Sequence, residues 1–208
     1  MLLPPLAVPS LGELKLICQV RGFPFIAGLE LAVRAGVLRV GDMLDGAVKV
    51  RVWVLLDQSR RNAQERRLDG QPWRSIGAKA KSLPGSQGSW PIGIANVGSR
   101  PNLALCEGGP DTLAAWSLAW WHGLHDEVAP VCMTGAGRRI HAEALRLFEG
   151  KGVFIIPHQD PAGLRAREVW TRQLLESGAR WVKPYQLRHH KDLADALCAA
   201  AAEMEDLP

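Results

Sequence analysis

The chain has 208 residues, of which 47% are hydrophobic and 22% are charged, a composition that excludes an intrinsically disordered protein. It has no run of 18 apolar residues and no positively charged leader, so we expect neither a membrane-spanning helix nor a secretory signal. The net charge of +4 is uneven, because residues 1–100 hold 14 Lys and Arg against 7 Asp and Glu, and residues 101–208 hold 11 against 14. This favours a polyanion-binding half beside a cation-binding half, with uneven surface charge alone as the alternative.

The first hundred residues predict a small basic α+β unit. Ser10 and Glu13 have the spacing of a capping box, which marks the start of a helix. Later residues alternate between apolar and polar and predict a strand hairpin. Residues 71–90, rich in Gly, Ser, Pro and Lys, predict a loop with little regular structure. The expected helices and strands are, in order, helix 11–20, helix 26–35, strand 47–57 and strand 63–68.

The pattern changes near residue 101, where short apolar strands begin to alternate with helices. This alternation predicts an α/β fold, a small parallel sheet with flanking helices, in which the chemistry lies at the carboxyl ends of the strands. The expected strands are 102–106, 129–133, 153–156 and 180–185. The expected helices are 111–121, 139–148, 164–176 and 191–202.

Four acidic residues, Glu107, Asp111, Asp160 and Asp192, fall at this carboxyl edge. Carboxylates gathered at one edge repel one another unless a cation lies between them, and hard oxygen ligands suit Mg²⁺ or Mn²⁺. The alternatives are that Glu107 and Asp160 are solvated loop acids and that Asp111 and Asp192 stabilise the starts of their helices. The four cysteines lack metal-ligand spacing, so we expect buried thiols in a cytoplasmic protein.

Three segments of this half carry motifs in a specific order: LALCEGGPDTLAAW (103–116), GVFIIPHQDPAGLRAREVW (152–170) and KDLADAL (191–197). Together they resemble the toprim domain, the metal-dependent module shared by bacterial primases, topoisomerases and some nucleases. The family pattern has Glu-Gly and a second acid, then Asp-x-Asp with a following Ala-Gly, then Lys-Asp before the last helix. The resemblance covers about half of the chain and implies a toprim-type sheet that uses Mg²⁺ or Mn²⁺.

The resemblance implies roles position by position. Glu107 matches the family glutamate, which acts as a general acid/base or helps to hold metal, and Asp111 matches the second acid of that motif. Asp160 matches the second Asp of the Asp-x-Asp pair and is implied, with Glu107, to be catalytic as well as metal-binding. Asp192 matches the acid after the lysine in the last motif. Asp195 lies one place beyond a position where a further family acid often stands.

One position departs from the family pattern, because His158 replaces the first Asp of the Asp-x-Asp pair. Histidine can ligate a metal through a neutral nitrogen, but it brings no negative charge. As a ligand, His158 would shift the preference of the site from Mg²⁺ towards Mn²⁺. The alternative is that His158 is not a ligand.

Basic residues and tryptophans interleave between Arg51 and Trp90, as expected for a surface that binds a single strand; a solvated hairpin face with core tryptophans is the alternative. The stretch VWVLLDQSRRNAQERRLDGQPW, with KAK and GSQGSWPIGI after it, resembles the basic subdomain that precedes toprim in primase catalytic cores. The resemblance implies a nucleic-acid track formed by Arg66, Arg67, Lys79 and Lys81, to which we add Lys191 of the Lys-Asp pair.

The sequence therefore predicts a primase-like basic subdomain at 1–100 and a toprim domain at 101–208. The expected function is divalent-metal-dependent nucleotidyl transfer on single-stranded DNA with nucleoside triphosphates. The alternatives are a catalytically degenerate nucleic-acid-binding module and a toprim-type nuclease. The sequence shows no zinc-module cysteine–histidine cluster and no helicase region, so we expect a stand-alone core, a phage-type protein or a fragment. Its expected partner is a replicative helicase or a separate zinc-binding module, and no membrane is expected.

Overall fold

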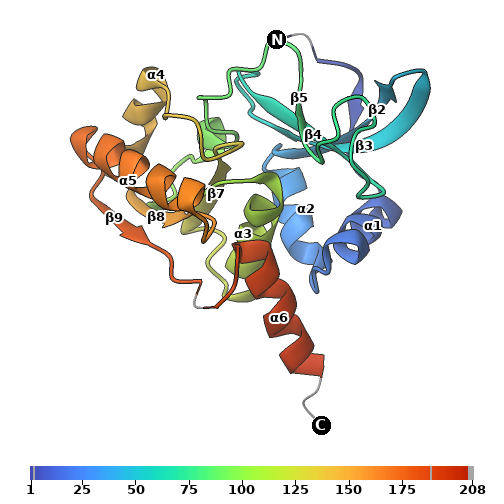
Figure 1. Cartoon of the computed structure of the whole chain (residues 1–208). Coiled ribbons are helices and arrows are strands. Elements are labelled where there is room, and N and C mark those ends of the chain that lie inside the picture. The colour runs from blue at the N-terminus through green and yellow to red at the C-terminus, as the bar shows by residue number, and fades with distance from the viewer. Residues whose placement is uncertain (2, 188, 206–208) are drawn as a thin grey trace.

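The computed structural model describes residues 1, 3–187 and 189–205. Its first half contains two helices and an antiparallel sheet with strand order β1-β2-β3-β4-β5 (Figure 1). The Ser10 side chain and the Glu13 side chain cap the first helix reciprocally, as the capping-box spacing predicts. The elements of this half are β1 Leu6–Ala7, α1 Leu11–Arg21, α2 Ile26–Arg34, β2 Leu38–Asp45, β3 Val48–Leu56, β4 Ala63–Arg67 and β5 Lys81–Ser82.

The predicted hairpin is confirmed as β3 and β4, which pair in antiparallel register with Val54 opposite Glu65. Strand β2 pairs along the other edge of β3 and was not among the expected elements. Its sequence, LRVGDMLD, places Gly41 and Asp42 in the middle of the strand, and both residue types are depleted in strands. At Gly41 the end of the Leu6 side chain of β1 lies 2.8 Å from the position that a Cβ would occupy, so a larger residue would displace that side chain.

The second half is the predicted α/β unit. Its four strands are all parallel, in the order β7-β6-β8-β9, and helices alternate with them along the chain. The elements are η1 Ile94–Asn96, β6 Asn102–Cys106, α3 Gly109–Trp121, β7 Val128–Cys132, α4 Ala142–Leu145, η2 Arg146–Phe148, β8 Gly152–Ile156, α5 Pro161–Glu176, β9 Trp181–Pro184 and α6 Leu193–Glu205.

The helix expected over 139–148 was too long, because only α4 and the short 3₁₀ turn η2 form there. The Gln173 side chain of α5 bonds both the N–H and the carbonyl of Ile140, each at 3.0 Å. The second bond takes the carbonyl that would accept a hydrogen bond in a longer helix. His141 then starts the helix as its N-cap, since its Nδ1 accepts the N–H of Glu143 at 3.2 Å.

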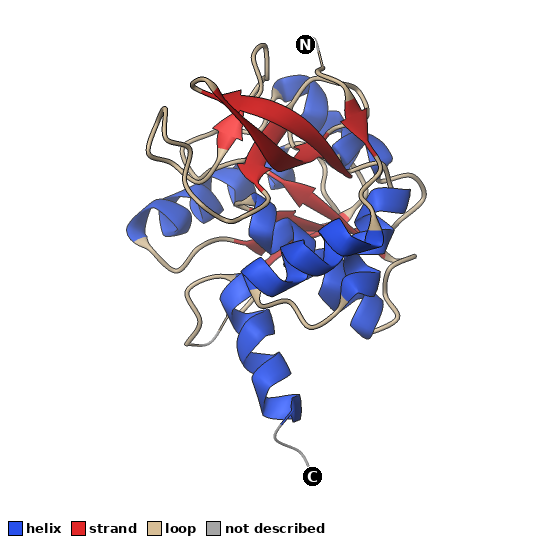
Figure 2. Cartoon of the chain, turned by 90° about the vertical axis from the view of Figure 1, so that its right-hand side faces the viewer, coloured by secondary structure: helices blue, strands red, loops and turns tan. Residues whose placement is uncertain are grey.

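Side chains of the parallel sheet alternate between two apolar clusters, as successive residues of a strand must. Leu103 and Leu105 of β6 pack with Phe148, Trp170 and other residues on the side of α4 and α5. The intervening Ala104 and Cys106 pack on the side of α3. In Figure 2 the helices lie on both sides of the strands, and α6 projects away from the body.

The cluster on the α3 side continues into the antiparallel sheet, because it also contains Trp53 and Leu55 of β3 and residues of α1 and α2. Helix α2 contacts α3 closely: a Cβ at Gly28 would lie 2.3 Å from the Cα of Ser117. The core therefore extends across the expected boundary at residue 100, and the two-domain division stays a prediction.

A buried carboxylate fixes the segment that joins the two sheets. Asp57 follows β3 and is fully buried. It accepts hydrogen bonds from Ser59, from Trp90 Nε1 at 3.0 Å, and from the backbone N–H groups of Gly93 at 3.1 Å and Ala95 at 3.3 Å. These bonds position the segment that leads into β6. Within the described residues, no helix has both the length and the apolarity needed to cross a membrane.

Candidate metal centre

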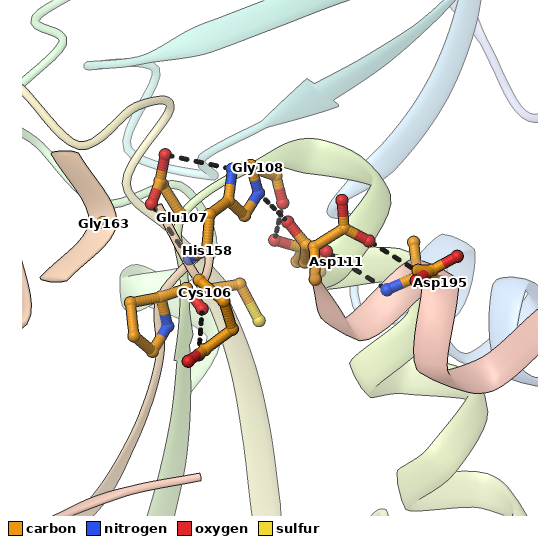
Figure 3. Close-up of polar contacts among 12 residues, drawn as sticks. Cys106, Glu107, Gly108, Asp111, His158, Gly163 and Asp195 are labelled. Carbon is orange, nitrogen blue, oxygen red and sulfur yellow. Dashed lines mark hydrogen bonds and ion pairs between the residues drawn. The ribbon is translucent and has the colours of Figure 1, made fainter. Parts of the chain in front are cut away.

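His158 lies between two carboxylates at the carboxyl edge of the parallel sheet (Figure 3). Glu107 follows β6, His158 follows β8, and Asp111 lies in the first turn of α3. The Nε2 atom of His158 is 2.9 Å from Asp111 Oδ2, and its Nδ1 atom is 3.3 Å from Glu107 Oε1. The backbone N–H of His158 also donates to Glu107 Oε2 at 3.2 Å. The imidazole thus links two acids that would otherwise repel each other.

Asp192 completes a group with the chemistry of a metal site. Asp111, His158 and Asp192 each offer one ligand atom, and these atoms lie within 4.8 Å of one another. Asp192 precedes α6, where its Oδ1 accepts the N–H of Asp195 at 2.9 Å. Asp111 reaches the same helix, since its Oδ1 accepts the N–H of Ala194 at 3.2 Å. The start of α6 is therefore fixed against the acidic edge.

Burial and charge act on the two titratable groups in the centre of this site. Burial raises the pKa of Glu107, and the neighbouring His158 partly opposes this rise. The hydrogen bond to Asp111 raises the pKa of His158, against the effect of its own burial. Protonated His158 is therefore favoured while both acids are charged, so the imidazolium is the local counterion in this arrangement.

Asp160 has a different local role. It is the N-cap of α5, and its Oδ1 accepts the N–H groups of Ala162 at 2.9 Å and Gly163 at 2.8 Å. These backbone bonds lower its pKa, that of Gly163 having the largest effect. Gly163 also permits close packing, because a Cβ there would lie 2.3 Å from the carbonyl oxygen of His158. Asp160 is not in the three-residue group, so its metal-binding and catalytic roles stay predictions.

Arg66 is directed from the antiparallel sheet towards this edge. Its guanidinium lies 5.9 Å from the ring centroid of Trp53, and Arg21 lies 5.7 Å from the same ring. Burial and, to a smaller extent, repulsion by Arg21 lower the pKa of Arg66 to about 10, while the carboxylate of Asp111 acts in the opposite direction. Its Nε atom is buried and has no hydrogen-bond partner among the residues that the structure describes.

The other basic residues of the predicted track differ in whether an acidic side chain already pairs with them. Arg67 pairs with Asp45 at 3.0 Å and with Asp69 at 2.5 Å, and its side chain is 11% exposed. Lys81 lies 3.5 Å from Glu65 and 4.6 Å from the centroid of the Trp73 ring. The remaining two, Lys79 and Lys191, are exposed.

Sequence reasoning missed a group of arginines at the same edge of the parallel sheet. Arg138, Arg139 and Arg165 line a small pocket between the loop after β7 and the first turns of α5. The loop begins at Thr134, whose φ of 58° is unusual for a residue other than glycine. The signal in the sequence was the MTGAGRR segment directly after a strand, where a functional loop of an α/β fold is expected.

No family model and no curated protein matches the sequence. Solved structures do match the fold. The primase fragment of the bacteriophage T7 primase-helicase protein superposes with a TM-score of 0.56 at 18% identity, over 86% of this chain and 69% of that one. T7 primase domains bound to an RNA/DNA hybrid and dTTP, in a structure with the lagging-strand DNA polymerase, superpose with a TM-score of 0.54 at 17% identity. That match covers 85% of this chain and 84% of that one.

The zinc-binding and RNA polymerase domains of the Aquifex aeolicus primase give a TM-score of 0.53 at 19% identity. That match covers 95% of this chain and 48% of the Aquifex chain. The chain therefore has the mixed α/β fold of a primase core, with a parallel sheet flanked by helices and an antiparallel sheet before it. At these identities the likeness concerns the fold alone.

Proposed function

We propose that this protein is a primase-like nucleotidyltransferase that joins nucleotides on a single-stranded DNA template and depends on a divalent metal. The observation that carries the proposal is the group of Asp111, His158 and Asp192, at the carboxyl edge of the parallel sheet in a primase-core fold. Ligands and catalytic groups of open α/β sheets gather at this edge. The template and the nucleoside triphosphates are part of the proposal.

The donor set fits a divalent ion. Two carboxylates and one imidazole are ligands that Mn²⁺ accepts, while Mg²⁺ prefers oxygen alone. Asp111, His158 and Asp192 would hold the ion, with His158 neutral. When bound, the ion would neutralise charge on the phosphates and on the leaving oxygen.

Glu107 is placed to move a proton. Its pKa is raised by burial, which makes it a stronger base than an exposed glutamate, and one of its oxygens is fixed by the His158 backbone. In this proposal it accepts the proton of the attacking hydroxyl. Arg66, Lys79 and Lys191 contact phosphates of the strand or nucleotide. Arg67 and Lys81 join them only where a phosphate replaces their present carboxylate partners.

The test is a template-directed synthesis assay with single-stranded DNA, labelled ribonucleotides, and either Mg²⁺ or Mn²⁺. We expect short labelled products, more with Mn²⁺, that are lost in Glu107→Gln and Asp111→Asn. Asp126→Asn is the matched control, because the Asp126 side chain is 90% exposed and its only ion-pair partner in the described chain is His125. If the template is shortened when no ribonucleotides are added, the protein is a nuclease and this proposal is wrong.

A second candidate function is a binding module that has lost catalysis. It is favoured by the position of His158, whose imidazole already links Glu107 and Asp111 as a cation would. His158→Asp discriminates the two. If the chain is a degenerate module, this variant gains metal-dependent synthesis that the parent lacks. If the parent is active with Mn²⁺, the variant moves the preference towards Mg²⁺. We also propose a helicase or a separate zinc-binding module as its partner, in view of the T7 primase-helicase neighbour.

A further inference from the structure

A second pocket, of about 360 Å³, lies at the opposite edge of the parallel sheet. It is lined by the end of α2, the middle of α3 and the segment that precedes β6. Arg100 comes just before β6, whereas Glu107 comes just after it, so five strand residues, about 17 Å of chain, separate this pocket from the candidate metal centre. The polar residues of its lining are Arg34, Gln58, Asn96, Arg100 and Trp116.

Two arginines of this pocket have no acidic partner. Arg34 is exposed at the end of α2, and Arg100 donates to the carbonyl oxygens of His125 at 2.8 Å and Asn96 at 3.3 Å. No carboxylate lies within 4.0 Å of either guanidinium in the described part of the chain, and the lining contains no acid. The carbonyl bonds hold Arg100 in place without neutralising it, so the pocket is positive.

Trp116 supplies an observation independent of charge. The residue is 2% exposed, and its indole N–H has no hydrogen-bond partner among residues 1, 3–187 and 189–205. Arg100 lies 5.8 Å from the centroid of the Trp116 ring, and both residues line the pocket. Asn96 Oδ1 is also buried without a partner in that part of the chain. Buried polar groups are usually paired, so these atoms indicate a ligand.

We propose that this pocket binds the terminal phosphate of a nucleotide, at a site separate from the candidate metal centre. Two guanidiniums and an indole N–H are hydrogen-bond donors suited to phosphate oxygens, and Asn96 Oδ1 accepts from a protonated oxygen or a hydroxyl. A terminal phosphate reaches a buried N–H more readily than an internal phosphodiester, which carries a sugar on each side. The site does not depend on the proposed catalytic function.

The test follows the indole N–H of Trp116 by ¹⁵N-resolved NMR, with EDTA present so that no divalent ion supports binding elsewhere. Trp116→Phe assigns the resonance, because it removes the indole N–H and keeps an aromatic ring at this position. The probes are inorganic phosphate, ATP, and a 12-residue oligothymidylate without a terminal phosphate. We expect phosphate and ATP to move the Trp116 resonance, and the oligothymidylate to leave it unchanged.

The variants test the charge. Arg34→Gln is expected to weaken ATP binding about tenfold, since it removes one charge-assisted contact, while Arg172→Gln, at an exposed site on α5, leaves it unchanged. Glu107→Gln also leaves it unchanged, which separates this site from the proposed function. The proposal is overturned if no probe moves the Trp116 resonance or if only the oligothymidylate moves it. It is also overturned if Arg34→Gln and the control Arg172→Gln weaken ATP binding equally.

Discussion

Asp57 gives the sharpest test of how the two sheets are joined. Asp57→Ala removes the acceptor of two buried donors, the indole N–H of Trp90 and the backbone N–H of Gly93. Each buried donor left unpaired costs about 1–3 kcal/mol, so we expect the free energy of unfolding to fall by about 4 kcal/mol. Asp57→Asn keeps one oxygen and turns its NH₂ group towards donors, and its expected cost is about 2 kcal/mol.

The assay is urea unfolding followed by far-ultraviolet circular dichroism, because the fluorescence of Trp90 would change for local reasons. Asp126→Asn, on a 90% exposed side chain, is the control and should stay within about 0.5 kcal/mol of the parent. A cost below about 1 kcal/mol for Asp57→Ala would refute the reasoning, because it would mean that water reaches these donors once the carboxylate is gone.

Three further predictions follow from contacts described above. Gly163→Ala forces a Cβ against the His158 carbonyl and should lower the free energy of unfolding by about 1–3 kcal/mol. Gly12→Ala, at an exposed site on α1 where the nearest atom is Ser10 Oγ at 4.0 Å, should raise it by about 0.5–1 kcal/mol; urea unfolding measures both. Burial raises the pKa of Glu65, so the folded state holds a proton that the unfolded chain loses above about pH 4.5. Stability then falls as pH rises through the folded pKa of Glu65. Glu65→Gln should flatten this fall and raise Tm at pH 7. If the dependence of Tm on pH is the same in the variant as in the parent, this prediction is wrong. If about four basic residues contact phosphates of single-stranded DNA, log affinity should fall against log salt with a slope of about −3, and a flat plot would contradict the assignment of the track.

The elements that the sequence predicted well are those whose own residues carry the signal. Helix α1 has its capping box, and the strands β6, β7 and β8 of the parallel sheet are apolar runs. Strand β2 was missed because Gly41 and Asp42 interrupt its pattern, and only pairing with β3 on one side and β1 on the other defines it. The short α4 depends on bonds from a side chain of α5, which no local pattern announces.

The sequence predicted the location of the candidate site, at one edge of the parallel sheet, but not the contacts between its side chains. The motif order placed Glu107, Asp111, His158, Asp160 and Asp192 after strands of one sheet, and the structure brings Asp111, His158 and Asp192 into one group. That His158 bridges two acids, and that Asp160 caps α5, depends on side-chain directions. Likewise, no sequence pattern distinguishes Arg66, stacked near Trp53 and mostly buried, from the exposed Lys79.

The apolar cluster that α3 shares with the antiparallel sheet affects how the chain folds during synthesis on the ribosome. The chain emerges from its amino terminus, so the face of the antiparallel sheet that bears Trp53 and Leu55 forms before the helix that covers it. Until residues 109–121 have left the exit tunnel, this apolar face is open to solvent. Nascent chains of about this length are therefore expected to be the forms that chaperones bind and that aggregate on truncation.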